Sequence, residues 1–199
     1  MLNTDSLITG LILAGGQGSR MGGKDKGLVL WHGRTLIEHT YCALTKQVPN
    51  IVISANRHLP DYRTFGVPIV SDEHPAFVGP IAGICSAINH LTKNLVNENP
   101  TALMVTPCDT PNIPCDLVAR LYANLAEKRS DVSVAFDGER LQNLHCLIRA
   151  EAWQDLLEFY ALGNLALRDW FKRVNTSKTD FSDKAGSFKN INHLEQLDL

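Results

Sequence analysis

The fold is decided by one stretch of sequence, which reads Leu13-Ala14-Gly15-Gly16-Gln17-Gly18-Ser19-Arg20-Met21-Gly22-Gly23-Lys24-Asp25-Lys26. The apolar segment before it, Leu7 to Leu13, is typical of a buried strand. The stretch holds five of the chain's 14 glycines within nine residues. Glycines let backbone N–H groups close around phosphate oxygens, and Arg20, Lys24 and Lys26 add positive charge. The sequence therefore predicts an anion-binding loop directly after a strand.

Strand and helix patterns alternate along the rest of the chain. Thr35 to Gln47 predicts a helix, and Thr35 with Glu38 forms a capping box at its start. The other expected elements are strands at Ile51 to Ser54 and Val67 to Val70, a helix from Gly79, a strand at Ala102 to Thr106, a helix at Leu117 to Ala126, strands at Val132 to Phe136 and Leu144 to Ile148, and a helix around Trp153 to Tyr160. This alternation predicts the α/β class, a three-layer sandwich with a mostly parallel sheet and helices on both faces. Ligands of such sheets bind beyond the carboxyl ends of the strands.

Length and composition indicate one globular domain over residues 1–199. Hydrophobic residues make up 44% and charged residues 20% of the 199, a balance that excludes a disordered chain. The formal net charge of −2 argues against a nucleic-acid partner. No apolar run approaches the roughly eighteen residues of a membrane-spanning helix. The first nine residues show no signal peptide, so a cytoplasmic protein is expected.

The cysteines and histidines show no metal-binding spacing. The five cysteines are odd in number and include no CxxC pair, which predicts reduced thiols that mostly fill the core. The seven histidines are likewise scattered, and His145, near a strand end, is expected to be structural.

Three interpretations of the glycine-rich loop can be weighed from its residues. Gly18 to Lys24 supplies the GxxxxGK of a Walker A loop, but Asp25 follows where a Ser or Thr hydroxyl is required. Gly16 and Gly18 begin a dinucleotide-binding fingerprint, but Met21 occupies the place of its third glycine. A glycine-rich turn with solvated charges is the third interpretation.

Further candidate residues follow other strands. Pro107 to Pro111 ends a strand abruptly and leaves Asp109 at its carboxyl end, where a carboxylate suits magnesium bound to triphosphate oxygens, although an Asp here could equally cap a turn. Asp72 follows a short strand and could also be a turn residue. Gly79 to Gly83 opens a helix whose free N–H groups could face an anion or a base edge, or simply start the helix at Pro80.

Near the C-terminus, Asn190 and Asn192 flank Ile191 with a period of two. This spacing places both amides on one face of a strand or edge, where they either bind a ligand or form a polar surface.

The loop pattern LAGGxxxRMGGxDK resembles the signature loop of nucleotidyltransferases that build cofactor dinucleotides and nucleotide sugars, and most closely that of the molybdenum cofactor guanylyltransferases, the MobA family. Three later segments are similar to that family's motifs and follow in the same order: Gly79-Pro80-Ile81-Ala82-Gly83, Cys108-Asp109-Thr110-Pro111 and Asn190-Ile191-Asn192. The resemblance covers nearly the whole chain. It implies a Rossmann-like nucleotidyltransferase fold with a nucleotide-binding part at about 1–112 and an acceptor-binding part at about 113–199.

The reaction that the resemblance implies is transfer of GMP from GTP to the terminal phosphate of molybdopterin (Mo-molybdopterin), with release of pyrophosphate and Mg²⁺ as cofactor. Proteins that deliver and collect the cofactor are implied as partners. A phosphate monoester is already an anion near neutral pH, so no Ser, Cys or His nucleophile is needed. Positioning and charge neutralisation are the expected means of catalysis.

The resemblance also implies roles for individual residues. The expected catalytic residues are Arg20, Lys26 and Asp109, and Asp109 is the expected metal ligand. The nucleotide is expected at Leu13, Ala14, Gly15, Gly16, Lys26, Ser54, Asp72, Gly79, Gly83 and Asp109, and the acceptor at Asn190 and Asn192.

Three positions depart from the family pattern. Ser54 stands where relatives usually have Asn, His193-Leu194 replaces a Thr-Pro pair, and Arg168 is what remains of paired arginines after Gly163.

Two other functions compete with this one. A related cytidylyltransferase or sugar-phosphate nucleotidyltransferase is the first. The cytidylyl branch typically has Ala-Ala-Gly where this chain has Leu13-Ala14-Gly15, which argues against that branch. A non-catalytic nucleotide- or cofactor-binding module is the second, and it would not need both Lys26 and Asp109.

Overall fold

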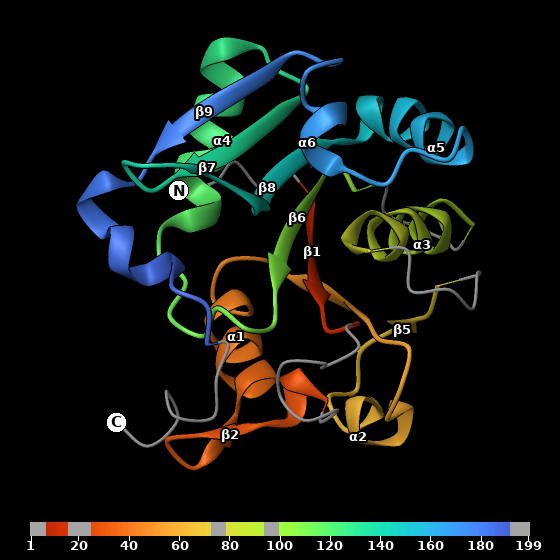
Figure 1. Cartoon of the computed structure of the whole chain (residues 1–199), viewed down its shortest axis with the longest axis vertical. Coiled ribbons are helices and arrows are strands. Elements are labelled where there is room, and N and C mark those ends of the chain that lie inside the picture. The colour runs from red at the N-terminus through yellow and green to blue at the C-terminus, as the bar shows by residue number, and fades with distance from the viewer. Residues whose placement is uncertain (1–6, 16–24, 73–78, 94–99, 192–199) are drawn as a thin grey trace.

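A computed structural model of the chain describes residues 7–15, 25–72, 79–93 and 100–191. Its centre is a seven-stranded sheet of order β5-β4-β1-β6-β8-β7-β9 (Figure 1). The strands of this sheet are β1 (Ile8–Leu13), β4 (Asn50–Ser54), β5 (Ile69–Val70), β6 (Ala102–Pro107), β7 (Val132–Phe136), β8 (Leu141–Arg149) and β9 (Thr176–Asp180). A separate two-stranded hairpin pairs β2 (Leu30–Trp31) with β3 (Arg34–Thr35).

The central strands β1 and β6 are parallel and buried along their whole length. Strands covered on both faces are typically rich in apolar residues, as both of these are. β1 also pairs in parallel with β4, and β4 with β5. The carboxyl ends of all four strands therefore meet at one edge of the sheet, as the sequence predicts.

The other half of the sheet departs from a simple parallel order. β8 runs antiparallel to both β6 and β7, whereas β9 pairs in parallel with β7. The sequence analysis did not predict β9. Its residues, Thr-Ser-Lys-Thr-Asp, form an edge strand in which Thr179 is the one buried residue, so no apolar period marks it.

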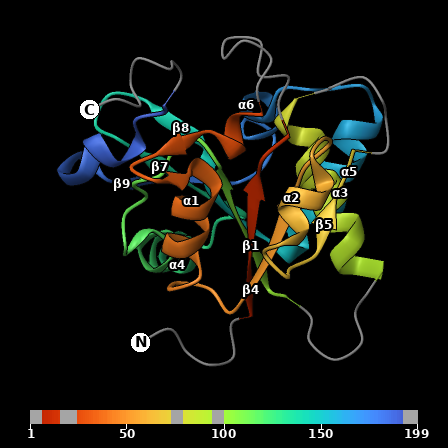
Figure 2. The same cartoon turned by 90° about the horizontal axis from the view of Figure 1, so that it is seen from below.

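Helices cover both faces of the sheet, which confirms the three-layer α/β prediction. Figure 2 shows α1 and α4 on one side of β1 and β4, with α3 and α5 on the other. The α-helices are α1 (Leu36–Leu44), α2 (Leu59–Arg63), α3 (Pro80–Lys93), α4 (Leu117–Lys128), α5 (Trp153–Ala161) and α6 (Leu167–Trp170), and the 3₁₀ helices are η2 (Lys26–Leu28), η3 (Ala150–Ala152) and η4 (Ser182–Phe188). In the part of the chain that the structure describes, no helix has both the length and the apolar character needed to cross a membrane.

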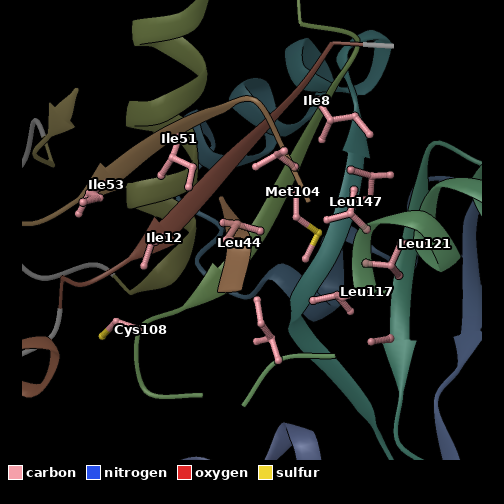
Figure 3. Packing of buried hydrophobic residues seen from close by; sticks show 14 of the residues in the cluster. Ile8, Ile12, Leu44, Ile51, Ile53, Met104, Cys108, Leu117, Leu121 and Leu147 are labelled. Atoms are coloured by element: carbon pink, nitrogen blue, oxygen red, sulfur yellow. The ribbon is translucent and has the colours of Figure 1, made fainter. Parts of the chain in front are cut away.

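Each face of the sheet has its own apolar core. In Figure 3, Ile12, Met104 and Leu147 from the strands lie with residues of α1 and α4, such as Leu44 and Leu121. The opposite core joins the other face of the strands to α3, α5 and α6, and includes Trp153 and Trp170. Three of the five free cysteines, Cys85, Cys108 and Cys146, are buried, in line with their expected role as core residues.

The predicted capping box at the start of α1 is present. The Thr35 backbone N–H donates to Glu38 Oε2 at 2.6 Å, and the Glu38 N–H donates to Thr35 Oγ1 at 3.3 Å. The Thr35 hydroxyl also donates to Glu38 Oε2 at 2.7 Å. The two hydrogen bonds that the Glu38 carboxylate accepts, first from the Thr35 hydroxyl and then from the Thr35 N–H, hold the pKa of Glu38 below its usual value.

We expect Thr35→Ala to lower the free energy of unfolding by about 0.5 to 2 kcal/mol near pH 7. The substitution removes Thr35 Oγ1, which accepts from the Glu38 N–H and donates to the Glu38 carboxylate. Since the folded state lowers the pKa of Glu38, its contribution is full above the unfolded pKa and is lost as the pH falls through the folded value. The difference between variant and wild type should therefore narrow in acid, as measured by urea unfolding at several pH values. Thr35→Ser keeps the hydroxyl and is the control; an equal loss in Thr35→Ser would show that the cap is not the cause.

Candidate active site

A cavity lies at the carboxyl edge of the parallel strands. Its lining consists of Leu13, Ala14, Gly15, Lys26, Ser54, Asp72, Gly79, Pro80, Gly83, Pro107, Cys108, Asp109 and Leu144. Every residue that the sequence analysis assigned to the nucleotide and that the structure describes is in this set. Gly16, Arg20 and Asn192 lie outside the described residues.

Backbone hydrogen bonds beyond the strand ends hold the cavity floor together. The Ala14 N–H donates to the Ser54 carbonyl at 2.8 Å, so the chain leaving β1 stays joined to β4. The Cys108 N–H donates to the Leu13 carbonyl at 3.0 Å and does the same between β6 and β1. The first residues of the glycine-rich loop and the segment carrying Asp109 therefore leave the sheet side by side.

An ion pair crosses the cavity between the two expected catalytic groups. Lys26 Nζ, at the start of η2, contacts Asp109 Oδ2, at the end of β6. The two side chains are 22% and 15% exposed, so both charges remain within reach of a ligand in the cavity. An ammonium next to a carboxylate can neutralise phosphate oxygens, while the carboxylate provides a site for a second cation.

Asp109 is also tied to the C-terminal part of the chain. The Ile191 N–H donates to the Asp109 carbonyl at 2.9 Å. The buried Thr110 hydroxyl lies 3.0 Å from Asn190 Oδ1 and 3.4 Å from Asp109 Oδ1. Asn190, a predicted acceptor-binding residue, is thereby placed beside the carboxylate.

The sequence analysis placed Asn190 in a strand or edge, and this is wrong for the described part of that segment. Asn190 and Ile191 belong to neither a helix nor a strand. After η4 the chain crosses to the end of β6 and meets it at the carbonyl of Asp109, beyond the last residue of that strand, instead of extending along the sheet.

Asp72 has a defined orientation because Asn56 binds it reciprocally. The Asn56 Nδ2 group donates to Asp72 Oδ2 at 2.7 Å, and the Asp72 N–H donates to Asn56 Oδ1 at 2.8 Å. Asp72 Oδ1 is buried and has no hydrogen-bond partner among the described residues. A buried acceptor of this kind is costly unless a donor reaches it, which makes it a candidate contact for a ligand N–H. Asn56 was not predicted as a site residue, although it lies two residues after Ser54 in the sequence.

Gly83 allows the start of α3 to pack closely against the strands. A Cβ at this position would lie 2.5 Å from Ser54 Oγ and 3.0 Å from Leu13 Cδ2. Glycine is therefore required for close approach here. The same contact places the Ser54 side chain between β4 and α3 at the cavity, where the sequence expected a nucleotide contact.

Neither Cys108 nor His145 provides a nucleophile or a general base at the cavity. Burial raises the pKa of the Cys108 thiol well above its usual value, so the thiol stays protonated. Burial lowers the pKa of His145 to about 3, and its ring packs edge-on against Phe188 with centroids 5.1 Å apart. His145 is not part of the cavity lining, in agreement with the structural role that the sequence indicates.

Two carboxylates line the cavity, Asp72, which Asn56 binds, and Asp109, which is the candidate metal ligand. Within the described ranges, no group of three or more His, Cys, Asp and Glu residues could hold one. Mg²⁺ commonly binds one or two protein carboxylates and completes its shell with phosphate oxygens and water. Asp109 fits that pattern and would need a phosphate-bearing ligand to complete the site.

A groove adjoins the cavity, because Pro80 and Leu144 line both. Its other lining residues are Ile81, Asn143, Leu165, Ala166, Leu167 and Arg168. Arg168 belongs to α6 and is exposed, and the neighbouring Leu165 is 47% exposed. The groove therefore combines an apolar surface with one cation next to the cavity.

Comparisons with known proteins point to one family. The model of the MobA-like NTP transferase domain matches residues 10–179. The chain is 39% identical to the molybdenum cofactor guanylyltransferase of Shewanella sp. (strain MR-4) over 95% of this chain and 92% of that protein. It is 42% identical to the protein of the same name from Cupriavidus pinatubonensis, over 96% and 94% of the two chains.

The fold is similar to that of molybdopterin-guanine dinucleotide biosynthesis protein A from Archaeoglobus fulgidus. The TM-score is 0.73 and the sequence identity 22%, over 96% of this chain and 95% of that one.

We expect Gly83→Ala to lower the free energy of unfolding by about 1 to 3 kcal/mol and to weaken binding of the nucleoside triphosphate, because the added methyl group must displace Ser54 or the start of α3. Urea unfolding and calorimetric titration measure the two effects. Gly186→Ala is the control, since no atom lies within 4 Å of a Cβ built there. Wild-type stability and affinity in Gly83→Ala would contradict this packing argument.

Proposed function

The chain belongs to the family of MobA-like NTP transferase domains, and from this premise we propose that it transfers GMP from GTP to the terminal phosphate of molybdopterin, forming molybdopterin guanine dinucleotide and pyrophosphate. The names of its relatives supply the reaction. The single observation that carries the proposal is the cavity in which Lys26 and Asp109 meet beside Ser54, Asp72 and Gly83.

The reaction is an in-line displacement at phosphorus. An oxygen of the molybdopterin phosphate forms a bond to the α-phosphorus of GTP, and the bond from that phosphorus to the oxygen bridging it to the β-phosphate breaks. The electron pair of the broken bond leaves with pyrophosphate. Because the attacking phosphate is already an anion, no side chain has to remove a proton. A cavity that offers charged side chains and backbone groups suits this chemistry.

Guanine has ring and exocyclic N–H donors on one edge, and Asp72 Oδ1 is the acceptor that we assign to that edge. It is buried, it has no partner among the described residues, and Asn56 fixes its orientation. Ser54, Gly79 and Gly83 complete the part of the cavity assigned to base and ribose. An adenine or cytosine base would present a different pattern of donors there and would leave buried polar groups unpaired.

The triphosphate is assigned to the part of the cavity beside Lys26 and Asp109. Leu13, Ala14 and Gly15 begin the loop, and Lys26 ends it with an ammonium directed toward Asp109. Gly16 and Arg20 are assigned to the same phosphates from the sequence alone. Asp109 is the residue that would hold Mg²⁺, which when bound supplies charge neutralisation to the phosphates. Lys26 and the loop N–H groups are assigned to the leaving pyrophosphate, whose negative charge they would neutralise.

The acceptor is assigned to the part of the chain at about 113–199, and the nucleotide to about 1–112. Asn190 lies beside Asp109 through Thr110, so it can bind the phosphate of the acceptor, with Asn192 assigned from the sequence. The groove that contains Leu165 and Arg168 adjoins the cavity and suits the bulk of a heterocyclic acceptor.

We expect the purified protein to form the dinucleotide and pyrophosphate from molybdopterin, magnesium and GTP. The kcat/KM for GTP should exceed those for CTP and ATP by about two orders of magnitude or more, because a mismatched base leaves buried acceptors and donors unsatisfied. Chromatography of the dinucleotide and a pyrophosphate assay with each nucleotide provide the measurement. Comparable kcat/KM values for CTP and GTP would contradict the guanine assignment.

Asp109→Asn should retain the fold and lose about 100- to 1,000-fold in kcat/KM, since the amide removes the negative charge that a metal ion and Lys26 both require. Circular dichroism and turnover across a magnesium titration test this. Asp116→Asn is the control, because that carboxylate pairs with Lys184 at 2.7 Å and does not line the cavity. If folded Asp109→Asn turns over normally at every magnesium concentration, Asp109 is a turn residue and not a metal ligand.

A further inference from the structure

A buried hydrogen-bonded pair lies directly behind Lys26. The Tyr62 hydroxyl donates to Asp25 Oδ1 at 2.5 Å, and the Gly27 N–H donates to the same oxygen at 3.1 Å. Tyr62 is 0% exposed and Asp25 7%. Asp25 and Gly27 are the chain neighbours of Lys26, whereas Tyr62 belongs to α2, which follows β4 in the sequence. A residue remote in sequence thus binds the backbone segment that carries the cation of the site.

The chemistry of the pair makes it a persistent contact. Burial raises the pKa of Tyr62 far above its usual value, so its hydroxyl keeps the proton that it donates. A hydrogen bond to a carboxylate is shorter and stronger than one between neutral groups. The carboxylate of Asp25 in turn has two donors on Oδ1, which compensate part of the free-energy cost of burying its charge.

Packing leaves this arrangement little freedom. A Cβ at Gly27 would lie 2.5 Å from the Tyr62 hydroxyl oxygen, so the backbone there touches the tyrosine directly. The Leu28 N–H donates to the Asp25 carbonyl at 3.1 Å and closes the turn of η2 around Lys26. The Cα of Lys26 is therefore held from both neighbouring residues.

We propose that Tyr62 and Asp25 are positioning residues, which fix the backbone on both sides of Lys26 and so direct its ammonium to Asp109 and to the phosphates of the nucleotide. The phosphate part of this inference rests on the proposed function. The contact with Asp109 does not, because the structure itself contains it.

The need for such an anchor follows from the lysine side chain. Its four-carbon stem is flexible, so the position of the ammonium is defined only if the Cα is fixed. A donor that stabilises a transition state must be in place before the reaction, and a displacement of about 1 Å can reduce the rate about 100-fold. Lys26 follows a glycine-rich loop, where the preceding backbone has few side chains to pack.

The test begins with Tyr62→Phe, which removes the hydroxyl and keeps the buried ring. We expect kcat/KM for GTP to fall about 10- to 100-fold in a folded protein, with the loss mainly in kcat. Tyr41→Phe is the matched control. Tyr41, in α1, packs against Phe65 and does not line the cavity, so this variant should retain wild-type kinetics. Wild-type kinetics in Tyr62→Phe would overturn the proposal.

A double-mutant cycle separates positioning from a general loss of stability. Lys26→Ala alone should lose about 100- to 1,000-fold in kcat/KM. If Tyr62 acts through Lys26, adding Tyr62→Phe to Lys26→Ala should cost little more, because the group that it positions is already absent. Losses that multiply in the double variant would assign Tyr62 to the fold alone and contradict the proposal.

Hydrogen exchange gives a readout that does not depend on turnover. The Gly27 amide should exchange faster in Tyr62→Phe than in wild type and Tyr41→Phe, since its acceptor Asp25 is no longer fixed. If Tyr62→Phe does not fold, Asp25→Asn and Asp25→Ala replace it: the amide oxygen of Asn can still accept both hydrogen bonds and should retain more activity. If wild-type protein forms no dinucleotide, the proposed function fails, while exchange at Gly27 still tests the anchor. Unchanged exchange at Gly27 would refute the anchor itself.

Discussion

The parallel pairing of β1 and β6 is the constraint on which the rest of the structure depends. Both strands are buried on both faces, and their register sets Leu13 opposite Pro107. Because the two strands end together, the loop after β1 and the carboxylate after β6 must leave the sheet at the same place. A shift of register by one residue would turn every side chain of β1 to the opposite core. Lys26 and Asp109 are separated by 83 positions in the chain. The pairing of β1 with β6 is what brings them together.

Local signals in the sequence were sufficient for most elements and for the edge of the sheet where the site lies. The apolar periods of α1, α3 and α4 and the runs of β1 and β6 predict their own structure, because burial of an apolar face determines them. The capping box of Thr35 and Glu38 is equally local. The cavity followed from these elements by the rule that ligands bind at the carboxyl ends of parallel strands. Nine predicted nucleotide-binding residues line it although they come from five separate segments.

Features that depend on contacts between distant segments could not be predicted from those signals. β9 carries polar residues and is a strand because β7 offers it a free edge. The antiparallel direction of β8 depends on how the chain returns from β7, which its own residues do not encode. The segment after η4 donates the Ile191 N–H to the Asp109 carbonyl instead of continuing a strand. The contact of Tyr62 with Asp25 has no sequence signal either, because neither residue reveals its partner before the chain folds.

The ion pair of Lys26 and Asp109 bears on how the site meets its substrates. Two opposite charges, each less than a quarter exposed, neutralise each other and limit the cost of partial desolvation. An ammonium has three donors and a carboxylate about four lone-pair sites, so neither group is saturated by the contact. Lys26 contacts Asp109 Oδ2, whereas Asp109 Oδ1 has the Thr110 hydroxyl at 3.4 Å, a long distance for a hydrogen bond. Oδ1 is therefore able to accept a stronger hydrogen bond or to bind a metal ion. The arrangement favours a site whose charges are already in place when the triphosphate enters, because rearranging them during the reaction would add to the barrier.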